Sequence, residues 1–188
     1  MKEEIKNDIL RVIKESIKAI QENNVVKLKD LSNTLIDNSS IYQDENAIII
    51  TILIYSLSKI MERSRLREYK DWGVFKKTVD ESLKKAHYSL ENNDVYNYEK
   101  NIKNILSGID NLDSRLKEYI KDIFYRAHIN KASRLYEHGL SIGRTAELLG
   151  ITKWDLMEYT GRTGIPDVKE NLTISVDKRL RTARSLFK

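Results

Sequence analysis

The chain has 188 residues, of which 32% are charged and one is proline, a composition typical of a globular, mostly helical protein with one or two domains. It contains no cysteine, which excludes disulfides, thiol catalysis and thiolate metal sites. The net charge of +5 resides in the last eleven residues, which carry five basic side chains and no acidic one. The remainder of the chain is electrically balanced, which is not typical of a nucleic-acid-binding surface.

Apolar residues recur every three or four positions through most of the chain, which predicts a bundle of amphipathic helices. The first stripe covers residues 5–20 and is interrupted by Asn23-Asn24. A second stripe covers residues 25–35. Asp44 is placed to cap a third helix, which contains the most apolar segment, residues 47–57.

This apolar segment has two structural interpretations. It is rich in β-branched residues, so a buried strand is the alternative to a helix. The polar continuation over residues 59–67 favours a helix. The segment is well short of the ~20 apolar residues that a membrane-spanning helix needs. The N-terminus is polar, so we expect no signal peptide, no membrane association and a cytoplasmic location.

Three further helices follow from the same spacing. Two stripes cover residues 75–90 and 95–109. A third begins at Leu112 and continues through Leu135 to His138-Gly139, where the glycine is a natural helix terminator. We expect this long helix to join the bundle rigidly to the next domain. No internal repeat and no flexible linker is evident.

Residues 141–159 carry the signature of a helix-turn-helix. Ser141 is placed to cap a short helix, and Gly150 stands where the chain must turn sharply with a positive φ. Thr152 is placed to cap the next helix, with Asp155 three residues later as in a capping box. We also expect a larger residue at position 150 to crowd the two helices.

Residues 136–166 resemble small prokaryotic helix-turn-helix proteins that are encoded beside PIN-domain nucleases and regarded as antitoxin-like. The similar pieces are the run Leu140–Ile151, the pair Trp154-Asp155 and the closing Gly164-Ile165-Pro166. The resemblance implies a role in transcription control or in binding a partner such as a toxin nuclease.

The residues expected to contact DNA belong to three groups. In a helix-turn-helix the first residues of the second helix face the base edges, and flanking arginines hold phosphates. The basic C-terminal residues have two interpretations, because they either follow a phosphate backbone of DNA or RNA or stay solvated while Leu180 and Phe187 dock on a subunit. The candidates are Thr152, Lys153 and Trp154 in the second helix, Arg144 and Arg162 beside it, and Lys178, Arg179, Arg181 and Arg184 in the tail.

The end of the chain is expected to hold one strand and one helix. Residues 172–176 alternate apolar and polar side chains, as a half-buried strand does. A single strand needs a partner, which is either a wing-like ribbon, a second subunit or another protein. Asp177 is placed to cap a final basic helix.

No residue pattern in the chain indicates catalysis. The sequence has no phosphate-binding glycine loop and no nucleophile elbow. Its three histidines, His87, His128 and His138, do not have metal-ligand spacing. We therefore expect no catalytic residue, no metal and no cofactor.

The sequence thus predicts an all-α protein with a helical bundle over residues 1–125, a helix-turn-helix domain over 126–167, and a short strand and basic helix over 168–188. The predicted function is that of a non-enzymatic DNA-binding regulator, an antitoxin-like transcriptional repressor that acts as a homodimer. The alternatives are an adaptor whose helix-turn-helix docks a partner protein through Trp154 and Met157, and an RNA-binding accessory protein.

Overall fold

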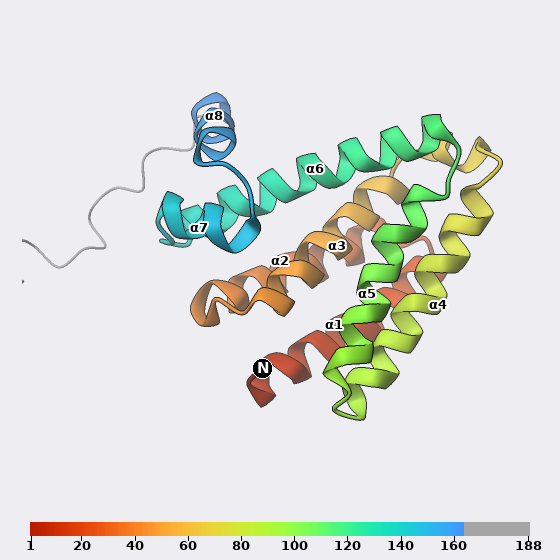
Figure 1. The fold of residues 1–188 in the computed structure, drawn as a ribbon, viewed down its shortest axis with the longest axis horizontal. Coiled ribbons are helices and arrows are strands. Elements are labelled where there is room, and N and C mark those ends of the chain that lie inside the picture. The colour runs from red at the N-terminus through yellow and green to blue at the C-terminus, as the bar shows by residue number, and fades with distance from the viewer. Residues whose placement is uncertain (164–188) are drawn as a thin grey trace, which may run out of the picture.

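The computed structural model describes residues 1–163, apart from the side chains of residues 38–42, 162 and 163. Within this range all regular structure is helical, which confirms the all-α class, and the expected strand and basic C-terminal helix lie outside the described residues (Figure 1). The α-helices are α1 Glu3–Gln21, α2 Val25–Tyr42, α3 Glu45–Met61, α4 Trp72–Glu91, α5 Val95–Asp110, α6 Ser114–Glu137, α7 Ile142–Leu149 and α8 Lys153–Thr163.

The apolar segment of the sequence is helix α3 and not a strand. Asp44 caps it as expected, since its carboxylate accepts a hydrogen bond from the backbone N–H of Ala47 at 3.1 Å. Most α3 side chains are buried on both sides, because α2 and α6 both pack against it. The helix ends at Met61 and does not continue through residues 62–67, where the chain forms a short 3-10 turn, Ser64–Glu68.

Helices α1–α2 and α4–α5 form an internal repeat, so the expectation that the chain has none was wrong. The turns between them are centred on Asn23 and Asn93, 70 positions apart, with positive φ values of 53° and 61°. In each turn the following residue donates its backbone N–H, at 2.8 Å, to a carbonyl near the end of the preceding helix. Equivalent side chains share one core: Ile5 and Phe75, Ile9 and Val79, Ile13 and Leu83, Ile20 and Leu90, Leu28 and Tyr98, Leu35 and Ile105.

The third helices of the two units, α3 and α6, are placed differently. Helix α3 packs along α2, whereas α6 diverges from α5 and packs on α3 (Figure 1). As a result Ile36 on α2 is 1% exposed, while Leu106, its equivalent on α5, is 45% exposed. The divergence of α6 therefore leaves part of α5 without a helical partner.

The C-terminal helices share a second, smaller core with the bundle. Helices α2 and α3 contribute Ile36, Ile48 and Ile52 to this core. The other members come from α6, α7, α8 and their connections: Ala132, Leu135, Leu140, Leu149 and Leu156. Helix α6 belongs to both cores and continues through the expected domain boundary at residue 125. The α7–α8 unit is thus packed on the bundle.

Candidate functional site

Helices α7 and α8 are joined by a tight turn with the predicted local chemistry. The Ser141 hydroxyl accepts a hydrogen bond from the backbone N–H of Arg144 at 3.2 Å, which caps α7. Gly150 ends α7 with φ of 61°, the left-handed conformation that glycine adopts without strain. A Cβ at this position meets no atom within 4 Å, so the expected crowding of the two helices was wrong. The backbone conformation alone explains the glycine.

Thr152 caps the start of α8 as predicted, but the Asp155 carboxylate bonds the Thr152 hydroxyl and not, as in a capping box, its backbone N–H. The Thr152 hydroxyl accepts a hydrogen bond from the backbone N–H of Asp155 at 3.1 Å and donates one to its carboxylate at 2.7 Å. One turn further, Leu156 is fully buried in the second core. The Tyr159 hydroxyl accepts a hydrogen bond from the Asn130 amide at 3.1 Å. These contacts fix α8 against α6.

The candidate DNA-contact residues differ in their freedom to bind a ligand. Lys153 and Trp154 are exposed at the start of α8, and Trp154 is 79% exposed. The hydroxyl of Thr152 is used in the cap. Arg144 is held by Glu147 at 3.0 Å and by the side-chain oxygen of Gln43 at 3.2 Å. The side chain of Arg162 lies outside the described residues, as do Lys178, Arg179, Arg181 and Arg184.

The exposed face of α8 mixes charge and apolar surface. Met157, one turn after Trp154, is 48% exposed, and Glu158 beside it is also exposed. Lys153 is the one basic residue of α8 whose side chain is described. This face therefore attracts phosphate weakly and offers an apolar contact.

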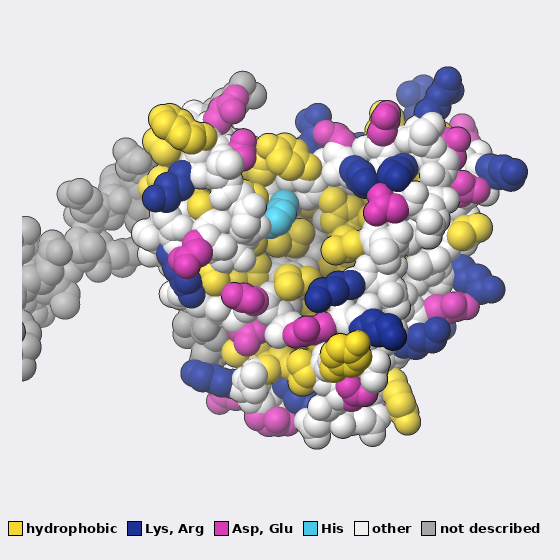
Figure 2. Space-filling view, in the orientation of Figure 1, with side chains coloured by type: hydrophobic (Ala, Val, Ile, Leu, Met, Phe, Trp, Pro, Cys, Tyr) yellow, Lys and Arg dark blue, Asp and Glu magenta, His cyan; other side chains and the backbone are white. Residues whose placement is uncertain are grey.

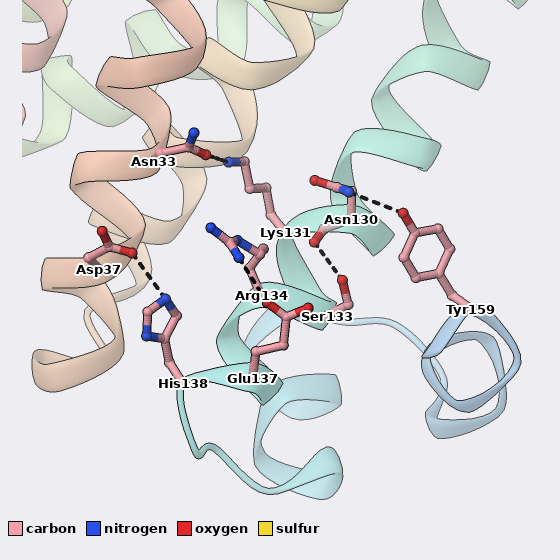
Figure 3. Close-up of polar contacts among 9 residues, drawn as sticks. All are labelled: Asn33, Asp37, Asn130, Lys131, Ser133, Arg134, Glu137, His138 and Tyr159. Carbon is pink, nitrogen blue, oxygen red and sulfur yellow. Dashed lines mark hydrogen bonds and ion pairs between the residues drawn. The ribbon is translucent and has the colours of Figure 1, made fainter. Parts of the chain in front are cut away.

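A buried lysine that is not among the predicted site residues joins three helices, and Figure 3 shows its contact with one of them, α2. Lys131 on α6 is 1% exposed, and its ammonium group donates a hydrogen bond to the Asn33 side-chain oxygen on α2 at 2.8 Å. The same ammonium group lies 4.3 Å from the centre of the Tyr55 ring on α3, a cation–π distance. Burial, reinforced by the positive charge of Arg134, lowers the pKa of Lys131 to about 8, and Asp37 opposes this shift.

Further polar contacts hold the C-terminal helices on the bundle. The His138 ring nitrogen lies 3.0 Å from the Asp37 carboxylate, which connects the end of α6 to α2 (Figure 3). The contact between Arg144 and Gln43 connects α7 to the loop that precedes α3. Together with Lys131, these contacts give the α7–α8 unit a defined position on the bundle.

A largely apolar cleft of about 830 Å³ lies where α6 diverges from α5. Its walls come from α3, α5, α6 and the end of α7, and Figure 2 shows the hollowed face with hydrophobic side chains in it. The apolar lining includes Ile48, Ile49, Ile52, Ile102, Leu106 and Leu149. The volume is within the range of small-molecule binding sites, about 300–1,000 Å³.

Polar groups of the cleft lie around this apolar lining. Burial lowers the pKa of His128, which favours the neutral ring, and the nearby backbone of Leu149 opposes this shift. Lys121 is paired with Asp110 at 2.7 Å. Lys103 is exposed and makes no ion pair or hydrogen bond with any described residue. The cleft therefore combines a large apolar lining with an uncompensated positive charge.

A second, more polar groove of about 630 Å³ lies between α3, α6 and α8. Tyr55, Asn130 and Tyr159 contribute to it, together with Arg63 and Glu158. Burial raises the pKa of Tyr55, and the neighbouring Tyr159 adds to the shift. The groove has side chains of both charge signs and no cluster of three metal-ligating residues is found in the described part of the chain.

One sequence signal could have identified Lys131. It stands midway between Ala127 and Leu135, at four-residue spacing within the apolar stripe of the long helix. A lysine in such a position is buried or reaches out of the core along its methylene chain. The cleft has no comparable signal, because its lining comes from four helices that are distant in sequence.

Comparison with known proteins gives one partial likeness. A UPF0175 protein of Aeropyrum pernix is 39% identical over 57 residues, which cover 27% of this chain and 64% of that protein. No family model matches the chain, and no solved structure matches it. None of the described helices is long and apolar enough to cross a membrane.

Proposed function

We propose that this protein is a DNA-binding regulator in which α7, the turn at Gly150 and α8 form a helix-turn-helix, with α8 as the recognition helix. In this proposal the protein acts as a homodimer, as regulators with paired half-sites commonly do. The proposal assigns it no catalytic activity.

The observation that carries the proposal is the local geometry of the α7–α8 connection. Two short helices, each capped by a side chain, meet at a left-handed glycine, and both pack on α6. In a DNA-binding helix-turn-helix, a connection of this kind presents the start of the second helix to the major groove. Lys153 and Trp154 are exposed at that position. The resemblance of residues 136–166 to antitoxin-like regulators supports the same function.

In this proposal the phosphate contacts come mainly from the basic residues that follow α8 in the sequence. Helix α8 carries little positive charge, and Arg144 on α7 forms an ion pair with Glu147. The surplus of positive charge follows α8 in the sequence, at residues 178–188. Neutralisation of phosphates supplies most of the non-specific affinity for DNA, so we expect these basic residues to provide most of that affinity.

One observation favours a second candidate, a protein-docking adaptor. Trp154 and Met157 present a large exposed apolar contact on α8, with acidic Glu158 beside them. Aromatic residues commonly dominate the binding energy of protein interfaces. In this alternative, α8 contacts a partner protein in place of DNA.

Point variants at α8 distinguish the two candidates. We expect Lys153→Ala to weaken specific DNA binding by about 1–3 kcal/mol if the lysine contacts a base. Duplex-DNA titration monitored by fluorescence anisotropy at several salt concentrations measures this effect. The matched control is Lys85→Ala, which removes an exposed lysine from α4 and should leave binding unchanged.

The adaptor candidate predicts the opposite order of effects. Trp154→Ala would then abolish capture of the protein partner, and Lys153→Ala would have little effect. Tyr96→Ala is the control for loss of an aromatic side chain, since Tyr96 is 75% exposed on α5. DNA binding that survives Lys153→Ala, together with loss of a partner in Trp154→Ala, would refute the regulator proposal.

A further inference from the structure

The cleft between α5 and α6 arises from a departure from the internal repeat. In the first unit α3 covers α2 along its length, but in the second α6 turns away from α5. Ile36 is therefore buried, whereas its equivalent Leu106 lines the cleft at 45% exposure. Ile49 on α3, in the same cleft, is also 45% exposed. Large apolar side chains that line one open cleft indicate a site for an apolar ligand.

The charge in the cleft indicates the polar part of that ligand. Asp110 is already neutralised by Lys117 at 3.2 Å and Lys121 at 2.7 Å. Lys103 lacks a counterion among the described residues and lines the same cleft. A ligand with an acidic group beside a long apolar body would satisfy both features, because its chain covers the apolar lining and its head group pairs with Lys103.

The position of the cleft connects the bundle to the α7–α8 unit. Its lining includes Leu148, Leu149 and Gly150, which form the end of α7 and the turn before α8. His128 lines the cleft together with Leu149, and the Leu149 backbone is near enough to affect its pKa. A bound molecule would contact α3 and α5 on one side and the turn on the other.

We propose that this cleft binds an amphipathic carboxylic acid with an aliphatic chain, and that the bound acid changes the position or mobility of α7 and α8. Binding itself is independent of the proposed DNA-binding function. Its regulatory consequence rests on that function. A ligand changes DNA affinity only if it binds the two arrangements of the α7–α8 unit with different affinities.

Decanoate is a suitable probe, with titration calorimetry of the full chain as the measurement. We expect one decanoate per chain, and weaker binding of 1-decanol because it lacks the charge. Leu106→Asp and Ile49→Asp place a carboxylate in the apolar lining, and each should weaken decanoate binding about tenfold or more. Both residues are partly exposed, which favours retention of the fold, and circular dichroism verifies it.

Two controls separate the cleft from general surface effects. Val26→Asp changes an apolar residue that is 68% exposed on α2, and it should bind decanoate as the unchanged protein does. Lys103→Gln should reduce the preference for decanoate over decanol without abolishing either. The proposed site would be overturned if decanoate does not bind, or if Leu106→Asp and Ile49→Asp bind decanoate as tightly as the unchanged protein. Dissociation of a dimer by Leu106→Asp without any decanoate binding would assign the cleft to a contact between copies and also overturn it.

Amide hydrogen exchange tests the coupling to α7 without DNA. Decanoate should slow exchange in residues 142–150, and this effect should be absent in Leu106→Asp. Unchanged exchange in this segment would refute the coupling even if decanoate binds. A protein that binds decanoate and protects α7 but fails to bind DNA would instead refute the DNA-binding proposal alone.

Discussion

At the scale of single residues, the most informative side chain is a buried charge. Lys131 has one hydrogen-bond partner, Asn33, and the face of the Tyr55 ring near its ammonium group. An ion buried without a matching counterion costs free energy, so the structure retains Lys131 at the expense of stability. In return, Lys131 positions α6 on both α2 and α3.

The lowered pKa of Lys131 predicts an unusual pH dependence of stability. Its pKa is about 8 in the folded protein and about 10.4 in an unfolded chain. Between these values the unfolded chain binds the proton and the folded protein does not, so the free energy of unfolding rises with pH. We expect Lys131→Met to remove this rise, up to about 3 kcal/mol between pH 7.5 and 10.5.

Urea unfolding of the unchanged protein and of Lys131→Met across this pH range measures the effect. The other lysines and tyrosines titrate in both proteins, so their contributions cancel in the difference. Lys85→Met is the matched control for an exposed lysine and should leave the pH dependence intact. Parallel pH profiles for Lys131→Met and the unchanged protein would show that Lys131 keeps an ordinary pKa.

A second residue-scale prediction concerns the hydroxyl of Tyr98. The side chain is 1% exposed, and its hydroxyl has no hydrogen-bond partner among the described residues. Its repeat equivalent is the apolar Leu28. We expect Tyr98→Phe to stabilise the protein by about 1 kcal/mol, because it removes an unpaired buried polar group. Thermal unfolding measures this change, with the exposed Tyr96→Phe as the control. A lower melting temperature for Tyr98→Phe would show that the hydroxyl has a partner.

At the scale of elements, the α7–α8 turn depends on one backbone conformation. Gly150 has φ of 61° with open space around its missing side chain. The backbone conformation therefore constrains this position, whereas a Cβ atom meets no steric obstacle. A substitution series can separate these two causes.

We expect Gly150→Val to destabilise the C-terminal helices by about 1–3 kcal/mol, the scale of a strained backbone position. Gly150→Asn should cost less, because asparagine tolerates the left-handed region. Gly161→Ala in α8, also surrounded by open space, is the control and should be neutral or slightly stabilising. Chemical denaturation followed by circular dichroism measures these changes. Equal stability of the valine and asparagine variants would contradict a backbone explanation.

At the scale of the whole molecule, helix α6 contributes to both hydrophobic cores. Its first half closes the core of the repeated bundle, and its second half carries the smaller core beneath α7 and α8. The apolar cleft lies against α6, and so does the second groove. A shift of α6 relative to α5 would therefore move the surface on which α7 and α8 pack.

The last prediction concerns the basic residues outside the described structure. If they bind phosphates, replacement of Lys178, Arg179, Arg181 and Arg184 by glutamine should weaken DNA binding and reduce its salt dependence by roughly one unit of slope per lost contact. Anisotropy titrations over a range of salt concentrations measure the slope. The matched control replaces four exposed lysines of the bundle. An unchanged slope would assign the basic residues to packing.

The sequence by itself determined the helices, their caps and the conformation of the turn. These features depend on neighbouring residues: apolar spacing, Asp44 before α3, Ser141 and Thr152 before α7 and α8, and Gly150 between them. The long α6 was also predictable, since its apolar spacing continues to His138-Gly139. Local hydrogen bonding and side-chain spacing are properties of short segments, so a sequence can reveal them.

Only the tertiary structure decided the repeat, the buried Lys131 network and the cleft. The repeat preserves burial but few residue identities, so helical spacing alone could not distinguish it from other amphipathic segments. Lys131 is separated from Asn33 by 98 positions. The cleft exists because α6 diverges from α5, an outcome of packing among helices that no local pattern encodes.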